Sequence, residues 1–225
     1  MEPPTSKRRR KTLRLKGWDY TSPGAYFVTI CTHQRAHLFG RVVDGKMVLN
    51  AYGKIVWEEW FKTAQVRPYV ALFEDEFVVM PNHIHGIIWI VELDPAVGAR
   101  RRRAPTKEQF GKPVAGSIPT IIRSFKSAVT RGINAHRGTP GERVWQRNYY
   151  EHIIRNERAL QAIRRYIAEN PLRWHLDRYN PEAIGPDPQA RALWRMLQAD
   201  ARALPRNSAA LLRPNHTPDN QEVAS

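Results

Sequence analysis

The chain has 225 residues, of which 42% are hydrophobic, enough for one ordinary domain with appendages and too many for disorder throughout. Its 36 Lys and Arg against 21 Asp and Glu give a net charge of +15, which favours a polyanionic partner over an acidic small molecule. A single cysteine, Cys31, excludes a disulfide framework and a multi-cysteine zinc site, and the most apolar stretch, Ile87 to Val91, is far shorter than the ~20 residues of a membrane span.

The N-terminal part predicts a basic arm followed by a strand, a hairpin and a helix. Residues 1–16 are basic without apolar periodicity, which indicates a mobile arm. β-Branched and aromatic residues predict a strand from Tyr26 to Thr32. A hairpin is expected over 38–49, because Asp44-Gly45 supplies the positive φ angles of a tight turn. Asn50 then caps an amphipathic helix.

The middle of the chain predicts two paired strands and an irregular insertion. The apolar runs Tyr69–Met80 and Ile84–Val91 flank Pro81-Asn82, as in two antiparallel strands joined by a short turn. Residues 93–117 contain repeated prolines, glycines and arginines, which indicate a flexible basic insertion within the domain.

Two further helices and one strand are expected after the insertion. The helix at 117–136 has one apolar face and one positive face. A short strand follows within 144–154, and then a helix from Asn156 to Glu169. Residues 177–225 contain repeated prolines and one helical patch at 189–199, which indicates an extension that is partly helical or disordered.

The order of these elements predicts an α+β fold. We expect a ferredoxin-like antiparallel sheet with helices on one face and an appended C-terminal helix. One domain would then span 17–176, between the arm and the extension.

The densest chemical signal is the run from Met80 to Gly86, which reads Met-Pro-Asn-His-Ile-His-Gly. Side chains two residues apart on a strand point to the same face, so His83 and His85 present two imidazoles side by side while Ile84 faces the core. Such a pair is either half of a metal site or two ordinary polar residues on a solvated face.

A second signal lies on the helix before Pro171. Tyr166 and Asn170 are four residues apart and therefore share one helix face, so a phenol and an amide oxygen can approach one point. Equally, Tyr166 suits the apolar face of its helix and Asn170 suits a C-terminal cap. The spacing permits both interpretations.

Several separated blocks in the right order carry a family resemblance. They are Pro23–Thr32, the string Pro-Asn-His-Ile-His-Gly-Ile-Ile at Pro81–Ile88, Val144–Arg155, and Tyr-Ile-x-x-Asn-Pro at Tyr166–Pro171. Together they resemble the REP-associated tyrosine transposases, relatives of the single-tyrosine HUH transposases. The resemblance extends from about Leu13 to Trp174.

The resemblance implies a metal-dependent DNA transposase. His83 and His85 match the paired metal ligands, and Tyr166, on the appended helix, matches the nucleophile that forms a 5′-phosphotyrosine. Asn170 matches the third ligand position, which is usually Gln in the related transposases. The implied cofactor is Mg²⁺ or Mn²⁺, and Mn²⁺ is expected to bind more tightly because imidazole suits it better. Either the metal or the neighbouring Arg164 or Arg165 would favour the phenolate.

The expected partner is single-stranded or hairpin DNA, processed by a cytoplasmic monomer or homodimer, with no membrane and no small-molecule substrate. Cationic and polar contacts to this DNA are expected from Arg123, Lys126, Arg131, Gln146 and Arg147. Three aromatic residues either stack on unpaired bases or pack in the core. They are Trp145, Tyr149 and Tyr150.

Two other functions compete with cleavage and rejoining. The first is a catalytically inactive protein that binds nucleic-acid hairpins, although both histidines and the tyrosine are present. The second is a replication initiator or relaxase of the broader HUH group. The initiator interpretation is weakened because the sequence contains no Gly-x-x-x-x-Gly-Lys-Ser/Thr loop of a helicase.

Overall fold

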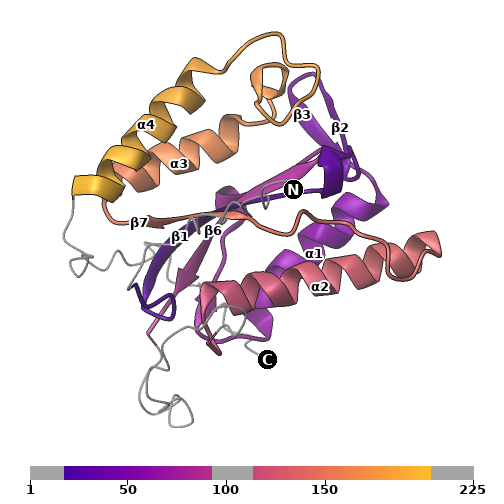
Figure 1. The fold of residues 1–225 in the computed structure, drawn as a ribbon, viewed down its shortest axis with the longest axis horizontal. Helices are drawn as coiled ribbons and strands as arrows, with labels where there is room; N and C mark the ends of the chain where they lie inside the picture. The colour runs from indigo at the N-terminus through magenta and orange to yellow at the C-terminus, as the bar shows by residue number, and fades with distance from the viewer. Residues whose placement is uncertain (1–17, 93–113, 204–225) are drawn as a thin grey trace, which may run out of the picture.

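The computed structural model describes residues 18–92 and 114–203, which form an antiparallel sheet between two pairs of helices (Figure 1). The strands are β1 (Gly24–Cys31), β2 (Gly40–Val43), β3 (Lys46–Leu49), β4 (Val70–Ala71), β5 (Phe77–Met80), β6 (His83–Ile90) and β7 (Tyr150–Ile154). The helices are α1 (Ala51–Gln65), α2 (Ile118–Arg137), α3 (Glu157–Glu169) and α4 (Pro188–Ala203), with the 3₁₀ turns η1 (His33–Arg35), η2 (Glu74–Glu76) and η3 (Trp174–Leu176). The predicted α+β class is confirmed.

Strand β1 lies inside the main sheet between β6 and β7, and every pairing is antiparallel. The expected strand pair around Pro81-Asn82 is present, because β5 pairs with β6. The apolar run at 69–80 is not one strand, however. It is divided into β4 and β5, which both pair with β6, by the acidic turn η2.

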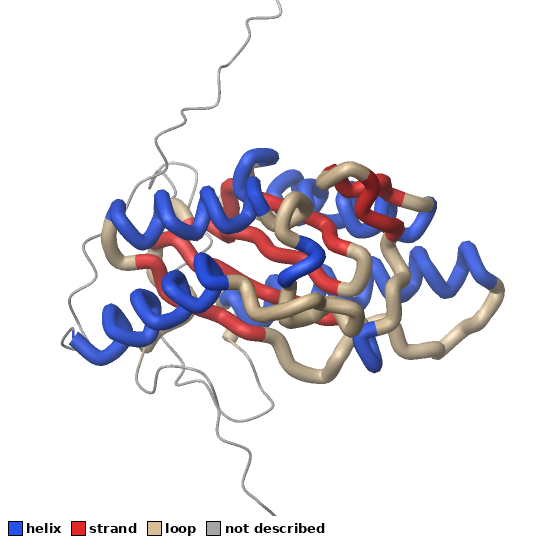
Figure 2. Tube along the Cα trace, turned by 90° about the horizontal axis from the view of Figure 1, so that it is seen from above, coloured by secondary structure: helices blue, strands red, loops and turns tan. Residues whose placement is uncertain are grey.

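Alternate residues of the sheet belong to two apolar cores, one on each face. Ile84 and Ile88 of β6 pack with α1 and α2, whereas Ile87 and Trp89 pack with α3 and α4. The expected helical layer on one face is thus α1 with α2. The appended helix α3 covers the opposite face together with α4, and Figure 2 shows from above how helices lie over the strands.

The hairpin and the helix caps follow local sequence signals. Asp44 and Gly45 have φ angles of 48° and 71°, as predicted for a tight turn between β2 and β3. The Asn50 side chain accepts a hydrogen bond of 3.0 Å from the Gly53 amide and caps α1 as predicted. Asn156 caps α3 in the same way.

Helix α3 is attached to the sheet by a buried ion pair. Glu76 Oε1 accepts hydrogen bonds from Nε and Nη2 of Arg164 at 2.8 and 2.7 Å, and its Oε2 accepts one from Trp89 Nε1 at 2.6 Å. The Glu76 side chain is fully buried. Arg164 belongs to the same helix as Tyr166, so the pair holds that helix against the sheet.

Replacing Arg164 by methionine should lower the free energy of unfolding by about 3–5 kcal/mol, because the buried Glu76 carboxylate would lose its cation. Urea denaturation followed by circular dichroism measures this change. Arg165→Met is the matched control, since Arg165 is exposed on the same helix and its loss should cost less than about 0.5 kcal/mol. Equal stability of the two variants would contradict the assigned role of the ion pair.

The described part of the predicted C-terminal extension packs on α3. The helical patch expected at 189–199 is present as α4, and its Leu193 and Leu197 join the apolar core over the sheet. Arg173 forms an ion pair with Asp187 just before α4 begins.

The described residues do not include three predicted segments: the arm, residues 93–113 of the insertion, and residues 204–225. Within the described ranges, no helix has both the length and the apolar character needed to cross a membrane.

Candidate active site

His83 and His85 lie at the start of β6, and both side chains point to the sheet face that α3 covers. Both are fully buried, and their Nε2 atoms are 3.0 Å apart. Ile84, between them, packs in the core on the opposite face. The alternation of the strand therefore places two imidazoles side by side, as the sequence predicts.

Hydrogen bonds of Asn82 determine which nitrogen of His83 carries the proton. Asn82 Nδ2 donates to the main-chain carbonyls of Arg35 at 3.1 Å and Tyr179 at 2.7 Å, so its Oδ1 faces His83. That oxygen can only accept, and its 2.9 Å contact therefore requires a proton on His83 Nδ1. His83 Nε2 consequently presents a lone pair toward His85.

The environment keeps both imidazoles neutral. Burial lowers the pKa of His83 to about 3 and lowers the pKa of His85 well below its ordinary value. His85 Nδ1 lies 2.8 Å from Thr29 Oγ1, a hydroxyl that can either donate or accept. Neutral imidazole is the form that binds metal ions, so both rings are ready to act as ligands at pH 7.

Tyr166 fits both interpretations of the sequence at once. Its ring packs against Phe27 and Trp194 in the apolar core, and the residue is only 7% exposed. Its hydroxyl nevertheless lies 3.2 Å from His85 Nε2. Burial first, and the Asp177 charge second, raise the pKa of the Tyr166 hydroxyl well above its ordinary value, so this hydroxyl is protonated in the closed site.

The two arginines expected beside the phenol have other surroundings. Arg164 is bound to Glu76, and Arg165 is exposed. The metal, Arg164 and Arg165 were the groups expected to favour the Tyr166 phenolate. Of these, Arg164 is already paired with the Glu76 carboxylate.

Asn170 caps the C-terminus of α3 and contributes an amide to the same cluster. It is 2% exposed, and its Nδ2 donates to Asp177 Oδ2 at 3.3 Å. Its Oδ1 accepts no hydrogen bond from the described residues. The amide partly opposes the lowering of the His83 pKa by burial, so it lies within reach of that ring. A buried carbonyl oxygen without a donor is suited to a metal ion.

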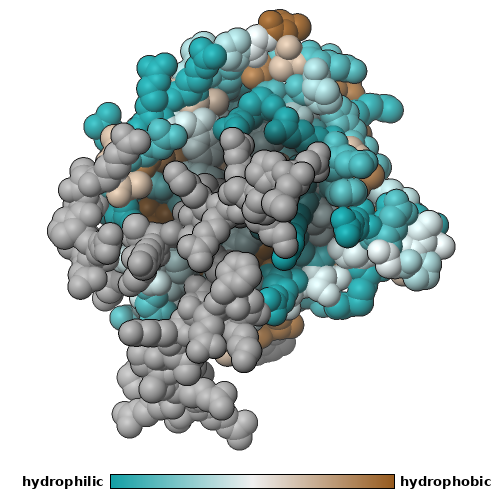
Figure 3. All heavy atoms as spheres, in the orientation of Figure 1, coloured by the Kyte–Doolittle hydropathy of each residue, from teal (hydrophilic) through white to brown (hydrophobic). Residues whose placement is uncertain are grey.

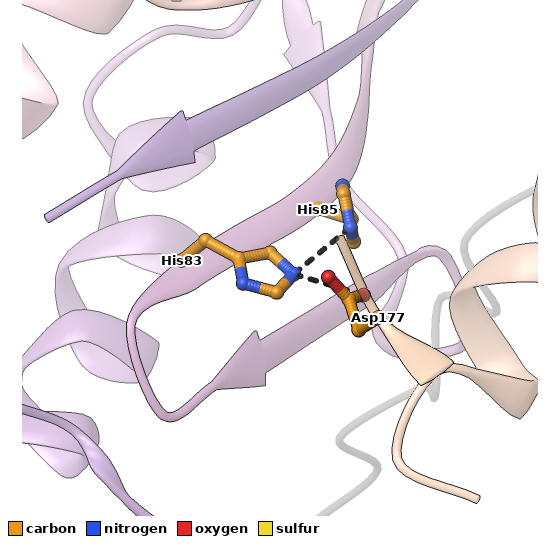
Figure 4. A group of neighbouring side chains, drawn as sticks. All are labelled: His83, His85 and Asp177. Carbon is orange, nitrogen blue, oxygen red and sulfur yellow. Dashed lines mark hydrogen bonds and ion pairs between the residues drawn. The ribbon is translucent and has the colours of Figure 1, made fainter. Parts of the chain in front are cut away.

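Asp177 and Tyr179 complete the cluster, and the sequence did not predict either of them. Asp177 Oδ2 lies 3.9 Å from His83 Nε2, and Figure 4 shows the carboxylate directed at the imidazole pair. The Tyr179 ring lies 4.7 Å from the His83 ring. Neither residue is related to the histidines by a helix or strand period. The local signal is a turn, in which the Tyr179 amide donates to Asp177 Oδ1 at 2.6 Å.

The donor set fits a divalent metal ion. One nitrogen from each histidine and one oxygen from Asp177 all lie within 4.8 Å of one another, beside the Asn170 amide. Imidazole nitrogen suits Mn²⁺ and later transition metals, and carboxylate and amide oxygens suit Mg²⁺ and Mn²⁺. The residues therefore fit the kind of metal site that the sequence predicts.

The cluster is closed in this arrangement. The residues that form it are 9% exposed or less; they are His83, His85, Tyr166, Asn170, Asp177 and Tyr179. Tyr179 covers His83 and is itself flanked by the guanidinium groups of Arg35 and Arg178, 5.5 and 5.3 Å from its ring centre. In this arrangement the imidazoles are therefore inaccessible to a polymeric substrate.

A basic groove of about 1140 Å³ lies between α2 and the loop at 140–147. Four of the five residues predicted to bind nucleic acid line it, namely Lys126, Arg131, Gln146 and Arg147. Arg123 is exposed on α2 but does not line the groove. His33 and Arg143 line it too, and the sequence did not single them out. The described surface visible in Figure 3 is mainly hydrophilic.

Some of the predicted DNA contacts have structural roles. The Lys126 ammonium donates to the carbonyls of Gln146 and Arg147, and burial lowers its pKa to about 8. Trp145 is 7% exposed and packs in the core, and Tyr150 packs edge-on against Trp194. Trp145 and Tyr150 therefore pack in the cores and do not offer stacking surfaces for unpaired bases.

Comparisons with known proteins support the family resemblance. No protein-family model matches the chain. An uncharacterized protein of Haemophilus influenzae is 39% identical over 168 residues, which cover 75% of this chain and 91% of that protein, so the two belong to one family. A second H. influenzae protein, provisionally named a REP-associated tyrosine transposase, is 27% identical over 156 residues, 69% of this chain and 74% of that protein. The resemblance to REP-associated tyrosine transposases is thus confirmed.

Two solved structures are also similar. One is a REP-associated tyrosine transposase bound to a REP hairpin, with a TM-score of 0.46 and 19% identity over 72% of this chain and 74% of that chain. The other is a provisionally named transposase from Deinococcus radiodurans, with a TM-score of 0.35 and 20% identity over 70% of this chain and 98% of that chain. Both TM-scores are below 0.5, so neither structure indicates which residues of this chain form a functional site.

Proposed function

We propose that this relative of the REP-associated tyrosine transposases is a metal-dependent DNA transposase that cleaves and rejoins single-stranded DNA beside a hairpin. The observation that carries the proposal is the convergence of Tyr166 with the histidine pair, since its hydroxyl lies 3.2 Å from His85 Nε2. A phenol placed beside a neutral imidazole pair is the arrangement needed for covalent attack on a phosphodiester.

In this proposal His83, His85 and Asn170 hold Mg²⁺ or Mn²⁺, and Mn²⁺ binds more tightly because two of the ligands are imidazoles. A cation bound there would withdraw charge from the phosphate oxygens and help to orient the scissile link. Asn82 holds His83 in the tautomer that leaves Nε2 free, and Thr29 can do the same for His85.

Tyr166 supplies the nucleophile. Its Oη attacks phosphorus, the bond to the 3′ oxygen breaks, and the 5′ phosphate becomes linked to the tyrosine. The phenolic proton leaves Tyr166 and the departing 3′ oxygen gains a proton, so the products are a phosphotyrosine and a 3′-hydroxyl. Attack by a 3′-hydroxyl on the same link rejoins DNA without ATP. Movement of residues 174–179 admits DNA and reduces the burial that keeps the phenol protonated.

The experiment that tests this function is an adduct assay. A hairpin oligonucleotide with a single-stranded flank, labelled at its 5′ or its 3′ end, is incubated with the protein and Mn²⁺. Denaturing electrophoresis should show protein joined to the 3′-labelled fragment only, because the tyrosine holds the 5′ phosphate of the piece downstream of the cut. EDTA should remove the adduct. Tight hairpin binding without any adduct, under every divalent metal tried, would refute the proposal.

A second candidate function is hairpin binding without cleavage. The observation that favours it is the closure of the cluster, because Tyr179 covers His83 and the site residues are almost fully buried. The same adduct assay decides between the two functions.

The groove residues carry a separate prediction. Replacing Arg131 and Arg147 by alanine should weaken binding to single-stranded DNA and reduce the slope of log affinity against log salt by about 1 to 2, because fewer counterions are released from the phosphates. Fluorescence anisotropy over a salt series measures the slope. The control removes Arg158 and Arg165, two exposed arginines of α3 on the opposite sheet face. An equal change in both double variants would show that the groove is not the DNA path.

A further inference from the structure

The first residues beyond η3 bring a carboxylate to the imidazole pair. Asp177 is 5% exposed, and its Oδ2 lies 3.9 Å from His83 Nε2 (Figure 4). The turn after it fixes the side chain, because Oδ1 accepts the Tyr179 amide at 2.6 Å while Oδ2 remains directed at the histidines. The carboxylate is thus held in place independently of its approach to His83.

The contact between Asp177 and His83 is not a hydrogen bond. The Asn82 amide places the only proton of the neutral His83 ring on Nδ1, so Nε2 and the carboxylate oxygen face each other as two acceptors. Asn170 Oδ1 is a third acceptor in the cluster and receives no hydrogen bond from the described residues. Asp177 Oδ2 does accept a hydrogen bond of 3.3 Å from Asn170 Nδ2, but a cation among the three acceptors would remove the repulsion between them.

Two of the separations suit one ion bound by both histidines and Asp177. Ligand atoms that are each about 2.1 Å from a metal ion lie roughly 3 to 4 Å apart. The separation between the two histidine Nε2 atoms is 3.0 Å, and that between His83 Nε2 and Asp177 Oδ2 is 3.9 Å.

Asp177 also differs in its partners from two other buried carboxylates, Glu76 and Asp187. Glu76 is paired with Arg164, and Asp187 is paired with Arg173. Among the described residues, no lysine or arginine forms an ion pair with Asp177. Burial raises the pKa of Asp177. A bound cation would supply the charge partner that the described residues do not give this carboxylate.

We propose that Asp177 is a fourth ligand of the metal ion held by His83, His85 and Asn170. This inference rests on the metal site of the proposed function. It gives the site one negative charge in place of a wholly neutral donor set, which strengthens the binding of a divalent cation. It also makes the position of residues 174–179 depend on metal binding, because Asp177 joins that segment to β6.

The test compares Mn²⁺ binding to the wild-type chain and to Asp177→Asn by isothermal titration calorimetry. The asparagine oxygen can still accept the Tyr179 amide, so the turn is retained while the charge is lost. We expect the dissociation constant for Mn²⁺ to rise by on the order of 10-fold or more. Glu182→Gln, which removes one exposed carboxylate, should leave it unchanged. Equal melting temperatures of the metal-free proteins exclude a folding defect.

Hydrogen exchange provides a second readout that does not depend on activity. Mn²⁺ should slow amide exchange in residues 174–179 of the wild-type chain, and this protection should be lost in Asp177→Asn. Unchanged Mn²⁺ affinity and unchanged protection in the variant would overturn the role of Asp177 and leave the three-ligand site intact. Failure of the wild-type chain to bind Mn²⁺ at all would instead refute the metal site itself.

Discussion

Replacing Tyr166 by phenylalanine should abolish the covalent adduct with DNA, a fall of at least about 1000-fold, while hairpin affinity changes by less than about threefold. The substitution removes one oxygen and keeps the ring that packs against Phe27 and Trp194, so the apolar core is preserved. Quantified adduct formation with Mn²⁺ measures the first effect, and fluorescence anisotropy measures the second.

The matched control for this prediction is Tyr150→Phe. Tyr150 packs on the same sheet face against Phe27 and Trp194, and burial raises its pKa to about 12. Within the described residues its hydroxyl forms no hydrogen bond with either imidazole, whereas the Tyr166 hydroxyl lies 3.2 Å from His85 Nε2. Adduct formation should therefore survive in Tyr150→Phe. An adduct that persists in Tyr166→Phe would identify a different nucleophile.

Replacing His83 by alanine should eliminate Mn²⁺ binding measured by calorimetry, a fall of on the order of 100-fold or more, and with it metal-supported cleavage. Because the proton of the neutral His83 ring is held on Nδ1, its Nε2 keeps a lone pair that can bind a metal ion. Its loss also leaves Asn82 Oδ1 without a donor, and we expect the free energy of unfolding to fall by about 1–3 kcal/mol.

His152→Ala separates metal binding from the general cost of removing a buried histidine. His152 is 8% exposed, and burial lowers its pKa to about 4, yet it lies outside the metal-ligand cluster. This variant should retain Mn²⁺ affinity and adduct formation. If both histidine variants lose Mn²⁺ binding equally, the effect belongs to the fold and not to the proposed ligand.

Features governed by short-range rules could be predicted from the sequence. The period of a strand places His83 and His85 on one face, and the turn residues Asp44 and Gly45 adopt the expected left-handed conformation. The caps at Asn50 and Asn156 are equally local, since each side chain bonds to an amide three residues ahead. The proposed roles of Tyr166 and Asn170 rest on the family resemblance, because their spacing alone also fits ordinary packing.

Features set by distant parts of the chain could not be predicted. The run at 69–80 is interrupted by η2, whose Glu76 binds Arg164, 88 residues away, and no local pattern encodes that partner. The amphipathic pattern of α3 shows that one side is buried but does not say against which face of the sheet. Asp177 reaches the histidines through the path of the chain after α3, so its place in the cluster depends on tertiary structure alone.

Successive residues of β6 belong alternately to the two faces of the sheet, and this alternation determines what each substitution in the strand would damage. Even-numbered positions support the layer under α1 and α2: a β-carbon added at Gly86 would lie 2.5 Å from the Trp60 ring. Odd-numbered positions begin with the two imidazoles. In a saturation scan of the strand, variants at positions 83 and 85 should lose the chemistry, whereas variants at positions that fill either core, Ile87 and Trp89 among them, should fail to accumulate. The glycine after the second histidine belongs to the latter group, because the Trp60 and Phe77 rings occupy the space that a β-carbon would need.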